Sequence, residues 1–184
     1  MSAAGLLRFA YYAYLSRPAG ERVLYRAMRR LRPRRIVELG LGDARRAQRL
    51  IRTAQRYAAG ESVRYTGVDL FEMRPAEQAR IGIKQAYHDL RAMGATVQLA
   101  PGDPFSALAR IANALTGTDL LVIAADNDAP SLARAWFYIP RMLHERTRVY
   151  LEHRDGDAST FRLLKRSEIE ALAATHERRP RRAA

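Results

Sequence analysis

Two glycines that follow an acidic residue form the first segment of the chain whose residue types could do chemistry. The segment reads Glu38-Leu39-Gly40-Leu41-Gly42-Asp43-Ala44 and comes directly after the apolar pair Ile36-Val37. Gly40 and Gly42 allow a ligand to come close to the backbone. A helix that begins after them would add free N–H groups as hydrogen-bond donors. The sequence therefore predicts a cofactor site at this turn.

Two classes of cofactor use a turn of this kind, and the spacing of the small residues separates them. A dinucleotide fingerprint, G-x-G-x-x-G, needs a small third residue because helix and strand pack closely there. Counting from Gly40, that position holds Arg45, which is too large. A G-x-G-x-G pattern places Ala44 third and has an acidic residue two positions before the first glycine, where Glu38 stands. A nicotinamide oxidoreductase is therefore disfavoured.

Three more acidic residues follow apolar runs later in the chain. Asp69 ends the run that begins at Thr66, Asp103 lies between Gly102 and Pro104, and Asp126 ends the run 119–126. In open α/β sheets, ligands bind outside the carboxyl ends of the strands, where the strand order reverses. We therefore expect these acidic residues to gather with the glycine turn at one edge of a sheet.

The elements that position these residues follow from the periodicity of the apolar residues. Two amphipathic helices open the chain, near 6–14 and 23–31, and Pro18-Ala19-Gly20 separates them. Strands and helices then alternate five times. The expected strands are 35–39, 63–69, 96–99, 119–124 and 148–152, with a sixth candidate at 161–164. The expected helices are 43–58 with Gly60 as C-cap, Pro75 to Gly94, 104–115, 130–143, and a last one opened by a capping box at 167–170.

This alternation predicts an α/β fold with an open, mostly parallel, doubly wound sheet. Short apolar strands indicate that helices cover both faces of the sheet, and parallel neighbours require right-handed crossovers. We divide the chain into N-terminal helices at 1–33, a ligand-binding domain at 34–176 and a basic tail at 177–184, which we expect to be disordered. The part of the fold that follows the fifth strand is expected to be shortened.

Four segments, in this order, resemble the motifs of the class I S-adenosylmethionine-dependent methyltransferases. They are 37–44, 66–70, 102–105 and 119–126, and the resemblance covers roughly residues 20–152. It implies a Rossmann-like sheet, S-adenosylmethionine as cofactor, and methyl transfer to a small-molecule acceptor by in-line displacement at the sulfonium methyl. Such a step needs mainly positioning of the reactants, so no particular catalytic residue is implied.

The resemblance also implies a role for each cofactor-binding residue. Glu38 would orient the glycine turn and meet the amino-acid end of the cofactor, directly or through water. The backbone at Gly40 and Gly42 would touch the cofactor. Asp69 would accept hydrogen bonds from the ribose diol, and Asp103 would accept one from the adenine amino group. Leu70 and Phe105 would lie on the two sides of the adenine ring.

Most of these residues also have a purely structural interpretation. Asp103, which precedes a proline, is a good N-cap for a helix. Asp69 can cap a turn, and the two glycines can form a tight turn without a ligand. Asp43 is the expected N-cap of the helix at 43–58. Glu38 is harder to explain in this way, because burial of an unpaired carboxylate is costly.

No metal site is predicted. Cation-dependent O-methyltransferases of this fold have an aspartate directly after the fourth strand and an Asp-Asn pair after the fifth, where this chain has Ala124 and Glu152-His153. Asp126 and Asp128 do not assemble that hard-cation site. His153 is either a general base or a surface residue. No Asn-Pro-Pro-Tyr-like run follows the fourth strand, so base flipping on DNA is not supported.

The chain is strongly basic, with 32 Lys and Arg residues against 19 Asp and Glu residues, a net charge of +13 and a pI near 10.9. The excess charge lies in residues 1–35 and 176–184. These basic residues either lie on solvated helix faces or form a surface that binds nucleic acid. Because Tyr25, the nearest aromatic residue, lies on the apolar side of its helix, we expect at most weak, sequence-independent binding. The alternative function is a non-catalytic methyltransferase-like binding or scaffold protein that contacts RNA through these ends.

Three further features of the sequence limit the classes of protein to which it can belong. The chain has no cysteine, which excludes disulfides, thiolate metal sites and a cysteine nucleophile. No apolar run reaches the ~18 residues of a membrane span, and Arg8 interrupts the apolar stretch that a signal peptide would need. We therefore expect a cytoplasmic protein. The Tyr11-Tyr12-Tyr14 cluster has three interpretations: a cover over the cofactor, a contact in a homodimer, or packing between helices.

Overall fold

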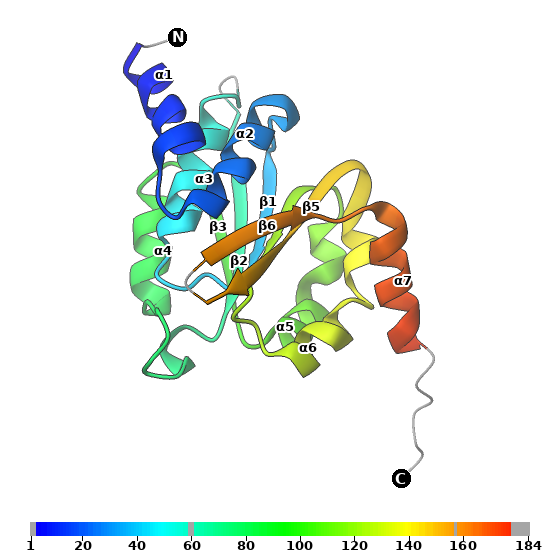
Figure 1. Ribbon diagram of the computed structural model, residues 1–184. Coiled ribbons are helices and arrows are strands. Elements are labelled where there is room, and N and C mark those ends of the chain that lie inside the picture. Colours follow the sequence, from blue (N-terminus) through cyan, green and yellow to red (C-terminus); the bar gives the residue numbers. More distant parts are fainter. Residues whose placement is uncertain (1–2, 59–60, 157, 178–184) are drawn as a thin grey trace.

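The computed structural model describes residues 3–58, 61–156 and 158–177, and its centre is a six-stranded sheet with helices on both faces (Figure 1). The strand order is β3-β2-β1-β4-β5-β6. Neighbouring strands from β3 to β5 are parallel, and β6 is antiparallel to β5. The strands are β1 (Arg35–Leu39), β2 (Arg64–Asp69), β3 (Thr96–Pro101), β4 (Thr118–Ile123), β5 (Leu143–Asp155) and β6 (Ala158–Leu163). The predicted α/β class, with a mostly parallel sheet, is confirmed.

Helices alternate with the strands, and they divide between the two faces of the sheet. In Figure 1, α1 to α4 cover one face and α5 to α7 the other. The helices are α1 (Ala3–Ala10), which continues as a π-helical turn at Tyr11–Leu15, α2 (Arg22–Leu31), α3 (Arg45–Gln55), α4 (Ile83–Arg91), α5 (Pro104–Ile111), α6 (Ala129–Ala135) and α7 (Arg166–Glu177). Short 3₁₀ turns lie at Ala19–Glu21, Phe71–Met73, Ala112–Leu115 and Ile139–Met142.

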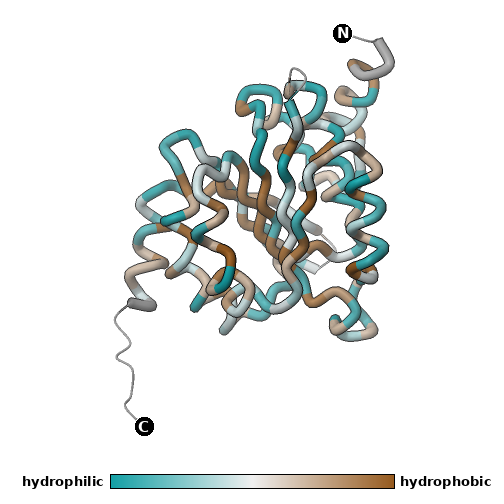
Figure 2. The backbone as a smooth tube through the Cα atoms, turned by 180° about the vertical axis from the view of Figure 1, so that it is seen from behind, coloured by the Kyte–Doolittle hydropathy of each residue, from teal (hydrophilic) through white to brown (hydrophobic). Residues whose placement is uncertain are grey.

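The alternation of side chains along the central strands creates two hydrophobic layers. Ile36 on β1 and Leu120 on β4 pack with α2 and α3, whereas Val37 and Leu121, one residue further on, pack with α5 and α6. Figure 2 shows hydrophobic strands inside the molecule and hydrophilic residues on the outer helices. Both faces of β1 and β4 are therefore buried, as their short apolar sequences predict.

The prediction of a long helix from Pro75 to Gly94 is wrong for the first half of that range. The chain is irregular from 74 to 82, and α4 begins only at Ile83. The Arg74 side chain is bound to Asp69, and Gly82 has an extended backbone with φ −66° and ψ 141°. The carboxylate of Glu72 then accepts the Ile83 N–H at 2.8 Å, so a side chain from before the irregular segment caps the helix.

Two expected helix caps are also wrong. The N-cap of α3 is Ala44, in the left-handed region at φ 62°, and Asp43, one residue earlier, accepts the backbone N–H of Arg45 at 3.1 Å. At α7, the Glu168 carboxylate accepts the Lys165 N–H at 2.7 Å. Only the glutamate half of a capping box is therefore present, and it caps the N–H of Lys165, two residues before the serine that the sequence favoured.

Several boundaries differ from the expected ones. Helices expected at 104–115 and 130–143 are shorter α-helices followed by 3₁₀ turns, and Pro140 in the second cannot donate the backbone hydrogen bond that an α-helix needs. β5 extends beyond 148–152 at both ends, because Leu143 pairs with Thr118 on β4 and residues 150–155 pair with β6. The sixth strand is confirmed, at 158–163. The C-cap assigned to Gly60 and the tail beyond 177 lie outside the described residues.

The N-terminal helices share the core of the sheet domain. Tyr12 is buried against Tyr25, with ring centroids 5.6 Å apart, which supports the packing interpretation for this tyrosine. Tyr11 and Tyr14 are exposed. The 3₁₀ turn at 19–21 touches β6 so closely that a Cβ atom on Gly20 would lie 1.8 Å from the Ser159 carbonyl oxygen. None of the described helices is both long and apolar enough to span a bilayer.

We predict that Gly20→Ala lowers the free energy of unfolding by about 1–3 kcal/mol, because the methyl group overlaps with backbone atoms that cannot move aside cheaply. Urea unfolding followed by circular dichroism measures this change. The exposed neighbour Ala19 provides the control, since Ala19→Ser should change stability by less than about 0.5 kcal/mol. An unchanged midpoint for Gly20→Ala would show that the turn does not rest on β6.

Candidate functional site

The glycine turn lies between β1 and α3, at the point where the strand order reverses. The Gly40 N–H donates to the Val68 carbonyl at 2.8 Å, and the Ala124 N–H donates to the Leu39 carbonyl at 2.8 Å. The Asn127 side-chain amide donates to the carbonyls of Leu39 and Ala124, at 2.9 and 2.8 Å. The turn is therefore fixed to the ends of both β2 and β4.

The two glycines of the turn have different surroundings. Gly40 has φ 89°, and a Cβ atom there would lie 2.7 Å from the Ala124 Cβ, so this position is closed by packing. Gly42 has φ 61°, and a Cβ atom there would meet nothing closer than the Ala79 carbonyl oxygen at 3.8 Å. The backbone at Gly42 is therefore the part of the turn that a ligand can approach.

Glu38 is buried in an ion cluster beneath the turn. It is two residues after Ile36 on β1, so its side chain points to the face that α3 covers. Its carboxylate accepts the Arg46 Nε–H at 2.6 Å and the Tyr65 hydroxyl at 2.5 Å. Burial raises the pKa of Glu38 above its ordinary value, and Arg46 and Tyr65 oppose this shift without reversing it.

Arg46 connects this cluster to the glycine turn and to β5. Its Nη2 donates to the Gly40 carbonyl at 2.8 Å, and its Nη1 lies 3.3 Å from the buried carboxylate of Glu152. Glu152 also accepts the Ala125 N–H at 3.1 Å. Glu38 therefore orients the glycine turn through Arg46. Its direct or water-mediated contact with a ligand stays a prediction, since the protein already provides a partner for each of its oxygens.

Asp69 ends β2 and binds the glycine turn from the other side. It is buried, and its Oδ2 accepts the N–H groups of Leu41 and Gly42 at 2.5 and 3.0 Å. It also accepts the Phe71 N–H at 2.8 Å. Burial alone would raise the pKa of Asp69, but hydrogen bonds from Arg74 and from the Phe71 and Gly42 N–H groups outweigh burial and lower it. Asp69 is therefore an ionised acceptor at neutral pH.

Arg74 completes a second buried cluster, between the ends of β2 and β4. Its Nε and Nη2 each donate to Asp69 at 2.6 Å, and its Nη1 donates to Asp126 at 2.5 Å. The other carboxylate oxygen of Asp126, Oδ1, is buried and has no hydrogen-bond partner among the described residues. It faces Gly40, where a Cβ atom would lie 3.0 Å from it.

The remaining predicted residues lie at the ends of β2 and β3, which the Gly102 N–H joins by donating to the Asp69 carbonyl at 2.9 Å. Asp103 is the N-cap of α5, accepting from Phe105 N and Ser106 N at 3.0 and 3.1 Å. Burial would raise its pKa, but hydrogen bonds from Ser106, Ser131 and the backbone lower it to about 2. The capping role of Asp103 is confirmed.

The two predicted ring contacts flank these strand ends. Leu70 follows Asp69 directly and is half-buried. Phe105 lies in the first turn of α5, and the Arg134 guanidinium lies 3.6 Å from the centre of its ring. The sequence thus predicted correctly that Glu38, Asp69, Asp103 and Asp126 gather with the glycine turn at one edge. A role of these residues in cofactor binding stays a prediction.

A cavity of about 310 Å³ lies beside the turn, at the carboxyl ends of β4 and β5. Its lining includes Asp126 and Asn127, which follow β4, and Glu152, His153 and Arg154 of β5. His153 is exposed. Within the described ranges, no group of three or more His, Asp or Glu side chains is placed to hold a metal ion.

Sequence reasoning missed the two buried arginines, Arg46 and Arg74. Arginine is so common in this chain that neither residue stands out. A signal was nevertheless present in Glu38, because a carboxylate in an apolar strand requires a buried partner. The first turn of the following helix is the nearest place from which such a partner can reach it.

No family model matches the sequence, and no curated protein matches it. Solved structures do match the fold. The O-methyltransferase TomG from Streptomyces achromogenes, which takes part in tomaymycin synthesis and was solved with SAM, is 16% identical, with a TM-score of 0.54 over 96% of this chain and 78% of that chain. A protein described as a caffeoyl-CoA O-methyltransferase, from Staphylococcus aureus, is 13% identical, with a TM-score of 0.53 over 96% and 81%.

The chain has the fold of these methyltransferases. The expected Rossmann-like methyltransferase sheet is thereby confirmed, and identities this low establish the fold alone. Within the methyltransferase fold, the glycine turn, Asp69 and Asp126 stand at the carboxyl edge where the strand order reverses. That edge is where ligands bind in doubly wound sheets.

We predict that Arg46→Met lowers the free energy of unfolding by about 3–5 kcal/mol near pH 7.5, because Glu38 is left as an uncompensated buried carboxylate and Glu152 keeps only Arg154, at 3.5 Å, as a cationic partner. The loss should shrink toward about pH 5.5. A carboxyl group whose pKa is raised in the folded state is less destabilising when it is protonated, so acidification favours the folded variant.

Urea unfolding at the two pH values measures both effects. Arg45→Met is the matched control, because Arg45 is exposed and lies one residue earlier on the same helix. A small loss that does not depend on pH would contradict the central role assigned to Arg46.

Proposed function

We propose that this chain binds S-adenosylmethionine at the carboxyl ends of β1 to β4 and transfers its methyl group to a small-molecule acceptor. The observation that carries the proposal is the glycine turn, held at the reversal of strand order by the acidic side chain that ends β2. The two neighbouring folds belong to O-methyltransferases, and one of them was solved with SAM. They do not favour the alternative of a non-catalytic binding module.

The residues present fit the charges of this cofactor. S-adenosylmethionine carries a cationic sulfonium and an ammonium group. Asp126 Oδ1 is a buried carboxylate oxygen beside Gly40 that lacks a partner among the described residues, and such an orphaned acceptor is costly. A cationic group of the ligand would satisfy it. The open backbone at Gly42 supports the same placement.

Arg74 must leave Asp69 before a ribose diol can bind there. A carboxylate offers about four acceptor positions, and Asp69 already accepts from Leu41 N, Gly42 N, Phe71 N and two guanidinium N–H groups. The two guanidinium donors resemble the two hydroxyl donors of a vicinal diol. Because Arg74 lies at the start of the irregular segment 74–82, it can move without disrupting a helix.

The cavity of about 310 Å³ at the ends of β4 and β5 provides room for the acceptor. Its volume is at the lower end of the roughly 300–1,000 Å³ typical of small-molecule sites. When bound, S-adenosylmethionine supplies an electrophilic methyl group. The chain itself orients the reactants, and His153 in the cavity wall can accept a proton from the acceptor, as histidine side chains do near neutral pH.

We predict that the protein binds S-adenosylmethionine and S-adenosylhomocysteine with micromolar or lower dissociation constants, and that it does not bind NAD. Titration calorimetry with the three ligands in parallel measures this. Ligand at about 100 times its dissociation constant should also add about 2.7 kcal/mol of stability. Absence of both heat and thermal shift at about 1 mM ligand would overturn the proposed function.

We predict that Asp69→Asn weakens binding of S-adenosylhomocysteine about 10- to 100-fold, because charged hydrogen bonds to the diol contribute about 1.5–3 kcal/mol. Asp43→Asn is the matched control: Asp43 is exposed, lies in the same turn and should leave affinity unchanged. Circular dichroism verifies that both variants are folded. Equal affinities in the two folded variants would restrict Asp69 to its turn-capping role.

We predict that Arg74→Gln lowers the stability of the ligand-free protein and tightens S-adenosylhomocysteine binding by about threefold or more, because the competitor for Asp69 is removed. Arg74→Lys keeps the charge but loses the two-pronged contact, and it should give an intermediate affinity. Calorimetry on both variants decides the matter. Weaker binding in both would mean that Arg74 holds the ligand and does not compete with it.

A further inference from the structure

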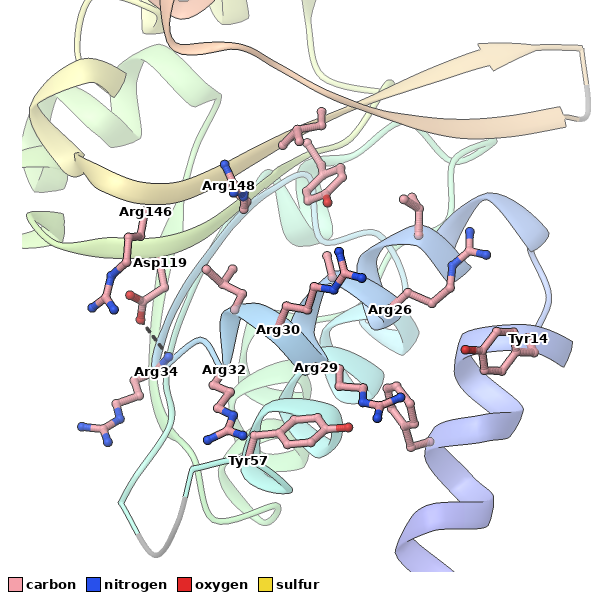
Figure 3. A pocket seen from close by; sticks show the side chains of 16 residues that line it. Tyr14, Arg26, Arg29, Arg30, Arg32, Arg34, Tyr57, Asp119, Arg146 and Arg148 are labelled. Atoms are coloured by element: carbon pink, nitrogen blue, oxygen red, sulfur yellow. Dashed lines mark hydrogen bonds between the residues drawn. The ribbon is translucent and has the colours of Figure 1, made fainter.

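A second hollow lies at the opposite edge of the sheet, near the amino ends of β1, β4 and β5. Its volume is about 1,610 Å³, and it runs between α2 and β5 (Figure 3). We call it the amino-edge groove. It is larger than the roughly 300–1,000 Å³ of a small-molecule site. Its size suits an extended ligand.

Seven arginines line the amino-edge groove. Arg26, Arg29 and Arg30 project from α2, and Arg146 and Arg148 line the same groove from β5 (Figure 3). The turn between α2 and β1 adds Arg32 and Arg34. All seven are exposed. Five of the seven lie within residues 26–34 of the sequence, and Arg146 and Arg148 come from more than a hundred positions later in the chain.

The positive charge of the groove is not neutralised within the part of the chain that the structure describes. Asp119 is its one acidic lining residue. The Asp119 carboxylate already accepts the N–H groups of Arg34 and Arg35 at 2.8 Å and lies 3.1 Å from His144 Nε2. Of the seven lining arginines, only Arg34 pairs with a carboxylate of the described residues, that of Glu61. Such a concentration of cations in a concave surface attracts polyanions.

Aromatic rings lie within the same groove. Tyr14 from the π-helical turn is 56% exposed, and Tyr57 beyond α3 lies next to Arg29 and Arg32 in Figure 3. We expected weak binding because Tyr25, the aromatic residue nearest in sequence, lies on the apolar side of its helix. The fold brings Tyr14 and Tyr57 into the same groove from distant segments. Arginine and aromatic side chains together form the usual surface for backbone phosphates and stacked bases.

We propose that the amino-edge groove binds single-stranded nucleic acid. The arginine guanidinium groups are planar forks that match phosphate oxygens, and the exposed ring of Tyr14 offers a face on which an unpaired base stacks. A double helix keeps its bases stacked on one another and a membrane has none, so neither offers an unpaired base to the Tyr14 ring. The site is separate from the glycine turn, so its occupancy does not depend on the proposed function.

The test is fluorescence anisotropy of the full chain with a labelled mixed-sequence 12-nucleotide RNA and with DNA of the same sequence. We expect binding to at least one of the two, weakened about 10- to 100-fold between about 50 and 200 mM salt as several phosphates are neutralised. The two arms identify which nucleic acid is preferred. Tighter binding of the corresponding duplex, of anionic lipid vesicles, or of polyglutamate would overturn the proposal.

Charge-reversed variants locate the site. The triple variant Arg29→Glu, Arg30→Glu, Arg148→Glu should bind about 10- to 100-fold more weakly than the wild type. The matched control Arg52→Glu, Arg91→Glu, Arg141→Glu changes net charge equally at exposed positions outside the groove and should bind within about threefold of wild type. Equal losses in the two triple variants would overturn the site, since only overall charge would then matter.

Tyr14→Ala separates base stacking from charge. Because Tyr14 is exposed, its truncation leaves the fold intact, and it should weaken binding of the 12-nucleotide strand about 5- to 100-fold. Inorganic polyphosphate, which has no bases, should be bound equally well by this variant and the wild type. Unchanged affinity of Tyr14→Ala for the nucleic acid would overturn the stacking part of the proposal.

Discussion

The buried guanidinium group of Arg46 lies between two buried carboxylates, at 2.6 Å from Glu38 on β1 and 3.3 Å from Glu152 on β5. Burial lowers the pKa of Arg46, but the two carboxylates more than compensate and raise it above its ordinary value, so the group stays charged. Three charges in an interior cannot be separated without leaving one of them uncompensated. Because Arg46 belongs to the first turn of α3 and also holds the Gly40 carbonyl, the helix, the glycine turn and the two strands must dock together.

The second buried cluster, around Arg74, has the same chemistry and a different support. Arg46 lies on a helix whose buried face packs in the core, whereas Arg74 begins a segment without regular structure. Asp126 keeps one oxygen without a partner among the described residues, so this cluster is not fully satisfied. The cluster around Arg74 therefore has the weaker support of the two. In the proposed complex, a ligand that supplies its own hydroxyl donors and a cation would replace Arg74, while Arg46 keeps the turn in place.

The sequence predicted what depends on local patterns. Short apolar runs predicted the strands, and acidic residues at their ends predicted the edge at which Glu38, Asp69, Asp103 and Asp126 meet. It did not predict what depends on distant partners. The start of α4 is set by Glu72, eleven residues earlier, and the C-terminal end of β5 is set by its pairing with β6. The roles of Arg46 and Arg74 follow from which carboxylates the fold buries beside them, and no periodicity in the sequence records that.

The topology also converts the order of residues along the chain into a separation of charge across the molecule. In a parallel sheet all the strands begin at one edge and end at the other. Acidic residues end β2 and follow β4, whereas Arg34, Arg64 and Arg146 stand before β1, at the start of β2 and in the first part of β5. The carboxyl edge therefore gathers carboxylates, and the amino edge gathers guanidinium groups, although neither group is contiguous in sequence. A cationic ligand is attracted to the first edge and repelled by the second, and a polyanion the reverse. The same strand directions that build the glycine turn thus keep the two proposed ligands on opposite edges of one sheet.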